Sequence, residues 1–362
     1  MSTFPKFRDI SLYLETFPLF RKPKHIGHYS MDEDGKYKND DSEKKYLKMD
    51  HVQLDKELEN PIDLQFDEEK YVKFQKEAWF PLHILLWIRD HKKQVWLEDE
   101  KRLNEDFISS GGTFKRIFLA PYSANDANFN IYKLNETFYI RYEREHDFSS
   151  SALCYLGHKF ELCLTSSVPD GKPHTDEVMV NENRKYYHVK KSKINDYNVM
   201  YSVNIDSVEI TTDQLGKTEE KGVELTTMSN VITDISTFKF KRYRLLKIWC
   251  DAFATGIDKT VCGFRGKKNS VTHLKIFETK NLSEIALQDI PQYKQKHMWR
   301  PQVCANFAEN FFNFIKSSHV EDGKMYRVTY TMDGDLKIKR AEEIDTQLLP
   351  DWYCKEFGNI DE

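Results

Sequence analysis

With 362 residues, 40% of them hydrophobic and 31% charged, the chain can bury a large core beneath an ordinary polar surface. Its formal net charge of −4 argues against a protein that coats nucleic acid non-specifically, because such binding depends on many cationic contacts with phosphates. We therefore expect one folded domain over residues 1–362, in which any contact with nucleic acid comes from a local basic site.

The six cysteines form no C-x-x-C pair and no Cys/His group with zinc spacing, so we expect reduced thiols, as in proteins of the nucleus or the cytoplasm. The first ten residues lack a basic leader followed by an apolar run, which argues against a secretory signal. The longest apolar stretch, residues 79–88, is too short to span a bilayer. We expect a core helix there and no membrane partner.

In chain order, residues 31–60 are highly charged and predict an exposed loop with short elements. A helix is expected near residues 68–90, kinked at Pro81, with an apolar face formed by Tyr71, Phe74, Ala78, Leu82 and Leu85. Residues 114–122 predict a strand, and two more strands flank Asn135 and Glu136. Residues 151–165 return to a helical period.

Residues 201–210 predict one buried strand, followed by a charged loop near residues 211–221 and a further strand at residues 221–227. Later elements are a helix at 240–253 that ends near Gly256, a hairpin over 259–279, a helix at 300–317 and a hairpin that turns at Asp333 and Gly334. This order lacks regular βαβ alternation and predicts an α/β (α+β) fold, with a mixed β-sheet core flanked by helices.

Three acids lie on elements that are otherwise apolar: Glu161, Asp206 and Glu224. Asn204 shares a strand face with Asp206, because residues two apart on a strand point the same way. An ionised carboxylate among core residues is costly unless it is compensated, and a divalent cation compensates it through oxygen ligands. The alternative for each acid taken alone is a solvent-facing residue on a half-exposed element.

Along nearly its whole length the sequence resembles the DXO-type (Dom3Z) decapping exoribonuclease family. The stretches that carry the resemblance are residues 17–32, 114–122, 156–161, 201–206, 222–227, 242–257, 262–266, 298–312 and 349–353. The resemblance implies a core related to the D-(D/E)-x-K nucleases and a cleft that takes RNA 5′ ends. It further implies hydrolysis of non-canonical caps, NAD caps and 5′-triphosphate ends, 5′–3′ exoribonuclease activity, and Mg²⁺ or Mn²⁺ as cofactor.

Carried over residue by residue, the family's G-Y-K-F-E motif falls on residues 157–161, its E-V-D on 204–206 and its E-L-K on 224–226. The resemblance thus implies metal ligands at Glu161, Asp206, Glu224 and Leu225, of which the three acids are also catalytic. Implied substrate-binding positions are Lys159, Asn204, Thr226 and Asp251.

Several of these positions depart from the family pattern. Asn204 stands for an acid, Thr226 for a lysine, Gly111 for an arginine and Asp251 for a glutamine. Each change removes or reverses a charge that the chemistry uses, so we expect weakened turnover. The alternative is an inactive paralogue that binds RNA 5′ ends, or one that serves a protein partner such as a 5′–3′ exoribonuclease, by analogy with fungal relatives.

Compensation for these losses has two possible sources. Asp251 either replaces the lost carboxylate or is simply a solvated helix residue. Lys115 or Arg116 moving into the vacant space is the less favoured source, because a strand at residues 114–122 fixes the direction of each side chain. The basic run Lys239, Lys241, Arg242, Arg244 and Lys247 either contacts the RNA backbone or forms the solvated face of a helix, and Phe264 and Trp299 either stack on bases or belong to the core.

Overall fold

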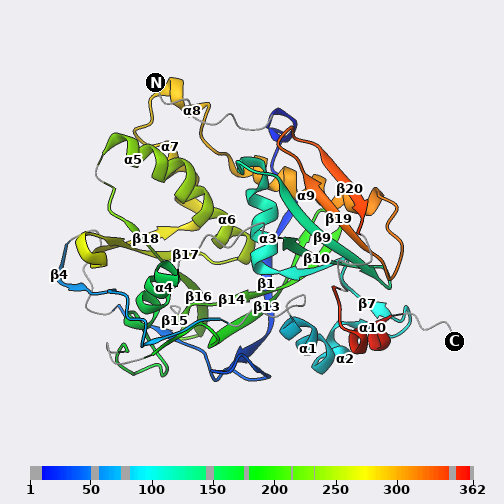
Figure 1. The fold of residues 1–362 in the computed structure, drawn as a ribbon, viewed down its shortest axis with the longest axis horizontal. Helices are drawn as coiled ribbons and strands as arrows, with labels where there is room; N and C mark the ends of the chain where they lie inside the picture. The colour runs from blue at the N-terminus through cyan, green and yellow to red at the C-terminus, as the bar shows by residue number, and fades with distance from the viewer. Residues whose placement is uncertain are drawn as a thin grey trace.

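The computed structural model describes residues 10–49, 57–74, 82–143, 151–174, 179–212, 215–231, 233–341 and 348–358. Two large mixed sheets dominate this part of the chain (Figure 1). The nine-stranded sheet has the order β2 (Tyr37–Lys38), β1 (Phe20–Met31), β13 (Lys185–Ile194), β14 (Tyr197–Asn204), β8 (Phe107–Ser110), β10 (Thr137–Glu143), β9 (Ala127–Leu134), β19 (Met325–Tyr330) and β20 (Leu336–Arg340).

The seven-stranded sheet has the order β11 (Thr165–Ser166), β3 (Tyr46–Leu47), β15 (Ser207–Thr212), β16 (Thr218–Ser229), β17 (Lys259–Arg265), β18 (Val271–Glu278) and β4 (Glu57–Ile62). Two small pairs join β5 (Tyr71–Val72) to β12 (Val180–Asn181) and β6 (Trp96–Leu97) to β7 (Arg102–Leu103). Parallel pairs such as β8 with β14 and β16 with β17 occur beside antiparallel ones. The predicted mixed α/β class is therefore confirmed.

The helices are α1 (Leu82–Asp90), α2 (Lys92–Val95), α3 (Gly111–Leu119), α4 (Ser151–Cys163), α5 (Asp234–Lys239), α6 (Leu245–Thr255), α7 (Leu282–Leu287), α8 (Gln292–Gln295), α9 (Pro301–Ser317) and α10 (Asp351–Phe357). A π-helical segment, Phe240–Arg244, joins α5 to α6, and short 3₁₀ turns lie at Ser11–Tyr13, Ala120–Tyr122, Lys267–Asn269 and Thr279–Asn281. No described helix is long and apolar enough to cross a membrane.

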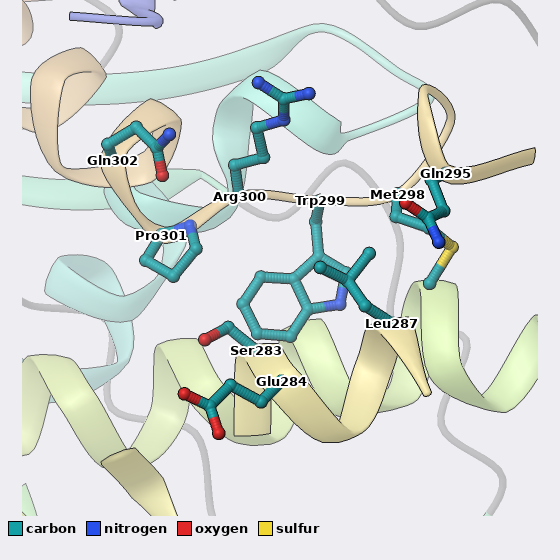
Figure 2. Close-up of a pocket in the computed structure, with 9 residues that line it drawn as sticks. All are labelled: Ser283, Glu284, Leu287, Gln295, Met298, Trp299, Arg300, Pro301 and Gln302. Atoms are coloured by element: carbon teal, nitrogen blue, oxygen red, sulfur yellow. The ribbon is translucent and has the colours of Figure 1, made fainter. Parts of the chain in front are cut away.

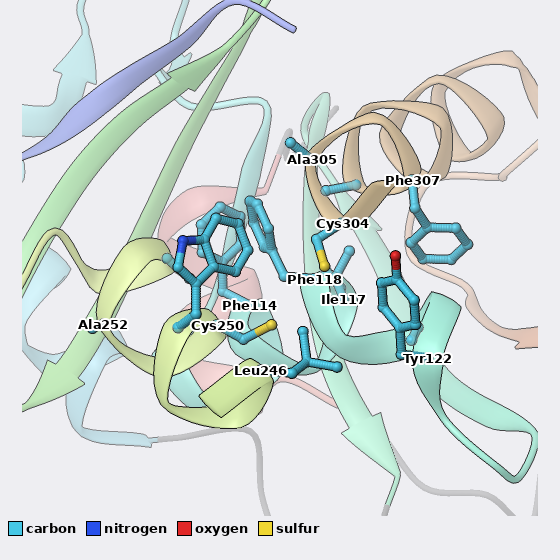
Figure 3. Packing of buried hydrophobic residues seen from close by; sticks show 14 of the residues in the cluster. Phe114, Ile117, Phe118, Tyr122, Leu246, Cys250, Ala252, Cys304, Ala305 and Phe307 are labelled. Atoms are coloured by element: carbon cyan, nitrogen blue, oxygen red, sulfur yellow. The ribbon is translucent and has the colours of Figure 1, made fainter. Parts of the chain in front are cut away.

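Helices α3, α6 and α9 pack together in the largest apolar core. Phe114 and Phe118 of α3, Leu246 of α6 and Phe307 of α9 all belong to this cluster, together with buried residues of both large sheets (Figure 3). Cys250 is also part of it, and all six cysteines are free thiols. Because α3 and α6 contact each other here, side chains that leave the core on their neighbouring faces enter a common space between the sheets.

The prediction of a strand at residues 114–122 was wrong, because residues 114–119 lie in α3 and residues 120–122 form a 3₁₀ turn. The Ser110 hydroxyl caps the helix by accepting a hydrogen bond from the Thr113 amide at 3.1 Å. Phe114, Ile117 and Phe118 are fully buried and recur at the spacing of one helix face. Aromatic and β-branched residues suggested a strand, but packing against α6 and α9 overrides that propensity.

The prediction of one continuous strand over residues 201–210 was also wrong. Strand β14 ends at Asn204 in the nine-stranded sheet, and β15 begins at Ser207 in the seven-stranded sheet. The chain crosses between the sheets at Ile205 and Asp206. The sequence carries a small sign of this crossing, because Asp206 and Ser207 are two consecutive polar residues and the alternation of apolar and polar residues shifts by one position there.

Two further boundaries differ from prediction. Within the helix expected near residues 68–90, Tyr71 lies in β5 and only Leu82–Asp90 is helical, while residues 75–81 lie outside the described part. In the charged loop expected near residues 211–221, β15 continues to Thr212 and β16 starts at Thr218, so most of this segment is the hairpin itself. In both places strand pairing decided the boundary: β5 pairs with β12, and β15 pairs with β16.

The remaining predicted elements are confirmed. Helix α4, the β9–β10 hairpin, the β17–β18 hairpin and helix α9 lie where the periodicity placed them. Gly256 ends α6 in the left-handed region at φ 68°, and Gly334 turns the β19–β20 hairpin at φ 92°. Residues 31–60 contain short strands, as expected, apart from residues 50–56, which lie outside the described part.

Removal of the Phe118 ring tests the importance of the α3 core. Its ring meets those of Phe20, Phe114 and Phe253 edge-on at centroid distances of 5.8, 5.3 and 5.8 Å. We expect Phe118→Ala to lower the free energy of unfolding by about 3–5 kcal/mol, because it leaves a cavity. Urea denaturation measures this, with Leu215→Ala, 93% exposed, as a control expected to change stability by less than about 0.5 kcal/mol.

Candidate active site

Four acids from four different elements meet at the crossing between the two sheets. Glu161 comes from α4, Asp206 from the β14–β15 crossing, Glu224 from β16 and Asp251 from α6. Glu161 and Glu224 both act electrostatically on Asp206, and Asp251 acts on Glu224, so the four share one neighbourhood. Their exposures are low: side chains of Glu161, Glu224 and Asp251 are 12%, 19% and 24% exposed, and Asp206 is 8% exposed.

Asp206 is held by hydrogen bonds at both of its carboxylate oxygens. The Leu225 amide donates to Oδ2 at 2.9 Å, and the Asn204 side-chain amide donates to Oδ1 at 3.0 Å. Burial, followed by the charges of Glu224 and Glu161, raises the pKa of Asp206 well above its usual value. Asn204 therefore orients an acid here instead of adding a fifth negative charge.

Glu161 is compensated by a histidine that the sequence analysis did not single out. His158 lies one helical turn away on α4, with its Nδ1 at 3.1 Å from Glu161 Oε2 and its Nε2 at 3.8 Å from Glu182 Oε1. Burial is the largest single influence and acts to raise the pKa of Glu161, but His158, Lys45 and Lys185 together outweigh it and the net shift is downward. The i, i+3 spacing was the one signal that could have identified this pair.

Lys115 lies between two of the acids. Its Nζ is 3.8 Å from Glu224 Oε1 and 3.8 Å from Asp251 Oδ1. Burial acts to lower the Lys115 pKa, but Glu224, Asp251 and Asp206 raise it overall. Lys115, expected to be the less favoured replacement for the lost charge, therefore does reach the acids, because residues 114–119 form a helix and not a strand. Asp251 faces the site and is not a purely solvated residue.

The same helix explains the glycine at position 111. A Cβ on Gly111 would come within 2.9 Å of the Ser202 carbonyl oxygen and 3.1 Å of a Val203 methyl, so this position has no room for a side chain. Lys115 follows Gly111 by four residues on α3 and therefore lies on the same helix face. The cation that the family resemblance implies at residue 111 enters from the next helical turn.

A second cation lies at the position where the resemblance implies a lysine. The Arg244 guanidinium donates from Nη2 to the Thr226 hydroxyl at 2.6 Å and to the Thr227 carbonyl at 3.1 Å. Thr226 and Glu224 project from the same face of β16, because they are two residues apart. The other two predicted substrate-binding residues differ in setting: Lys159 is buried within α4, and Asn204 is occupied with Asp206.

The donor set suits a hard cation such as Mg²⁺ or Mn²⁺, which prefers oxygen ligands. Glu224 Oε2 is buried and has no hydrogen-bond partner among the described residues. Among the described residues, however, there is no group of three or more Asp, Glu, His or Cys side chains whose arrangement could hold a metal ion. A metal ion at Glu224 would compete with Lys115, whose Nζ lies 3.8 Å from Glu224 Oε1.

The nearest large cavity adjoins the Glu161 end of the site. It measures 490 Å³, and Lys45, His158, His174 and Arg184 contribute basic side chains to its lining. A separate 310 Å³ pocket, in which Trp299 faces Ser283 and Glu284 of α7, contains none of the four acids (Figure 2). Trp299 and Phe264 are 2% and 6% exposed, so the suggestion that they stack on bases is wrong and both belong to the core.

The chain is similar in sequence to known nucleases. A family model described as RAI1 like PD-(D/E)XK nuclease matches residues 21–354. The decapping and exoribonuclease protein of Xenopus laevis is 26% identical over 95% of this chain and 88% of its own length. The decapping nuclease RAI1 of Aspergillus fumigatus is also 26% identical, over 90% of each chain.

Solved structures share the fold. Candida albicans Rai1, in complex with pU5 and Mn²⁺, matches with a TM-score of 0.79 and 18% identity over 98% of this chain and 99% of that one. Scheffersomyces stipitis Rai1, in complex with (3'-NADP)+ and calcium ion, matches with a TM-score of 0.76 and 18% identity, covering 93% and 94% of the two chains.

Replacing Lys115 tests its role as the counter-charge of the acids. At pH 7, we expect Lys115→Met to lower the free energy of unfolding by about 1–3 kcal/mol, because Glu224 and Asp251 lose a partly buried partner. Millimolar Mn²⁺ should stabilise this variant more than the wild type. Thermal denaturation with and without Mn²⁺ measures both effects, and exposed Lys24→Met is the control. Equal Mn²⁺ stabilisation of variant and wild type would contradict this role.

The raised carboxyl pKa values predict a pH dependence. Burial, followed by Asp251 and Glu161, raises the pKa of Glu224 against the opposing effect of Lys115, so the folded state retains protons that the unfolded state has released. This contribution to stability falls as pH rises above the ordinary carboxyl value of 4.5. We expect Glu224→Gln to gain stability relative to wild type as pH increases from 5 to 8 in EDTA. A constant difference between the two denaturation series would show that Glu224 does not titrate in this way.

Proposed function

Because the chain belongs to the RAI1-like PD-(D/E)XK nuclease family, we propose that it processes RNA 5′ ends as a metal-dependent decapping hydrolase. The observation that carries this proposal is the shared neighbourhood of four poorly exposed acids from four elements, two of which lie 3.8 Å from the Lys115 ammonium group. The proposed substrates are RNAs with non-canonical caps, NAD caps or 5′-triphosphate ends, with 5′–3′ exoribonuclease activity after the cap is removed. The names of the similar proteins support this substrate class.

The proposed cofactor is Mg²⁺ or Mn²⁺. Glu161, Asp206, Glu224 and the main chain at Leu225 would hold it, and Asp251 is the acid best placed to compensate for Asn204. When bound, such an ion polarises a phosphoryl oxygen and activates water. The complexes of Candida albicans Rai1 with Mn²⁺ and of Scheffersomyces stipitis Rai1 with calcium support a divalent ion in this kind of site.

The chain's own residues support slow turnover. The Asn204 amide and the Leu225 amide fix the orientation of Asp206, so this acid is positioned before substrate arrives. Lys115 neutralises Glu224 and Asp251 and competes with a metal for both. An enzyme built this way needs a higher divalent-ion concentration than one in which the acids lack an internal counter-charge.

A second candidate function is recognition of RNA 5′ ends without cleavage. The ion pairs of Lys115 favour it, because an ammonium group replaces the charge of a metal but cannot supply its chemistry. In this case the chain would bind or protect 5′ ends. The family resemblance also carries the proposal of a 5′–3′ exoribonuclease partner, and of action in the nucleus or the cytoplasm.

Product release from 5′-labelled RNA separates the two functions. With enzyme in excess and millimolar Mn²⁺ or Mg²⁺, we expect slow release of a cap fragment or mononucleotide, reduced by at least about 100-fold in Glu224→Ala. Glu219→Ala is the matched control, because Glu219 is exposed on the same strand. If Glu224→Ala still released the cap fragment or mononucleotide at the wild-type rate, this group of acids would not be the catalytic site. RNA binding without release from the wild type would favour the second function.

A further inference from the structure

We propose that Arg244, assisted by Lys247, is the phosphate-contacting cation of this site and binds the 5′-terminal phosphate of an RNA strand. The inference deepens the proposed function and depends on it for the identity of the ligand. It concerns residues other than the substrate-binding positions that the resemblance implies, which are Lys159, Asn204, Thr226 and Asp251. The argument rests on where the Arg244 guanidinium is held, on its unpaired charge and on its cationic neighbours.

The position of Arg244 is fixed by β16. Its Nη2 hydrogen bonds to the Thr226 hydroxyl and the Thr227 carbonyl, at 2.6 and 3.1 Å, leave the guanidinium against the strand face that also carries Glu224. Both acceptors are neutral, so neither cancels the positive charge. The side chain is thereby preorganised beside the acids but is not neutralised by them.

Arg244 also has an unused donor. Its Nε is buried and lacks a hydrogen-bond partner among the described residues, and no carboxylate in those ranges forms an ion pair with Arg244. A buried, charged N–H without an acceptor costs free energy, so an acceptor supplied by a ligand would stabilise it. A phosphate presents several oxygens in the geometry that the planar guanidinium matches.

Other cations surround Arg244. Arg265 of β17 and Lys247 of α6 both lie within its electrostatic range, and Arg265 Nε is likewise buried without a partner in the described part. Arg244, Lys247 and Asp251 are spaced i, i+3 and i+7, so they form one face of the helix that leads toward the four acids. A group of cations beside acids, in which Asp251 acts on Lys247 but no carboxylate of the described residues pairs with Arg244, provides the two halves of a site for a phosphate ester and its metal.

The structure also divides the basic run that the sequence left undecided. Lys241 and Arg242 are buried and donate to the main-chain carbonyls of Gln288 and His297, which gives them structural roles. Lys239 is exposed at the end of α5. Arg244 and Lys247 are thus the members of the run that lie beside the acids.

RNA binding tests the proposal in EDTA, where no turnover can occur. The probe is a 3′-labelled RNA pentamer with a 5′ phosphate, titrated by fluorescence anisotropy against the full chain. We expect Arg244→Met to weaken binding by about 10–100-fold, because a charge-assisted hydrogen bond is lost. Arg244→Lys should weaken it less, since it retains the charge without the planar fork. Lys239→Met, on the same basic run, should bind like the wild type.

Three further arms make the result specific. A matched pentamer with a 5′ hydroxyl should bind the wild type as weakly as the phosphorylated pentamer binds Arg244→Met. In the double variant Thr226→Lys with Arg244→Met, a lysine on β16 should restore part of the affinity, which guards against loss of folding as the explanation. Inorganic phosphate at equal concentration should not displace the pentamer, because the RNA makes additional contacts.

Several outcomes would overturn the inference. These are wild-type affinity in Arg244→Met, equal binding of the 5′-hydroxyl pentamer, and full displacement by inorganic phosphate. They leave the proposed function untouched if Glu224→Ala still abolishes product release. Conversely, loss of RNA affinity in Arg244→Met together with unchanged turnover in Glu224→Ala would support the phosphate site and contradict the proposed hydrolytic centre.

Discussion

The organisation of this site follows from the cost of placing negative charge in a poorly solvated crossing between two sheets. Asp206 occupies the two-residue passage between β14 and β15, where its carboxylate is almost fully removed from water. Carboxylates nearby raise that cost, so every charge around it requires compensation. His158 compensates Glu161, and Lys115 compensates Glu224 and Asp251. The cations that stabilise these acids in the folded chain would also compete with a metal ion for the same carboxylates.

Compared with the family pattern, the chain has moved its charges rather than lost them. The position of Gly111 is closed by the Ser202 carbonyl, and Lys115 enters from one helical turn further along α3. The position of Thr226 carries no charge of its own, but Arg244 bonds to it from the π-helical segment. The substitution of a charged motif residue therefore does not by itself show that the site has lost that charge. The electrostatic field depends on where a charged group lies and not on which residue carries it.

The pattern of the sequence predicted most long elements, because burial of one face leaves a clear period in helices such as α9 and in hairpins such as β19–β20. It failed at residues 114–122 and 201–210. In the first case, aromatic residues that favour a strand are buried in a helix by packing against α6 and α9. In the second, a strand leaves one sheet and joins another, and the only trace in the sequence is the polar pair Asp206 and Ser207, which shifts the alternation by one position. Both failures lie at the site, where local preference and tertiary packing disagree.

By itself, the sequence determined the chemistry that is present: the acids Glu161, Asp206, Glu224 and Asp251, the amide at Asn204 and the family to which these motifs belong. Only the tertiary structure decided which of them meet, and that His158, Lys115 and Arg244 neutralise or border them. The physical reason is that compensation of charge acts through space over a few ångströms. Apart from the i, i+3 pair of His158 and Glu161, the groups that compensate one another are far apart in the chain, so no local spacing in the sequence records their contact.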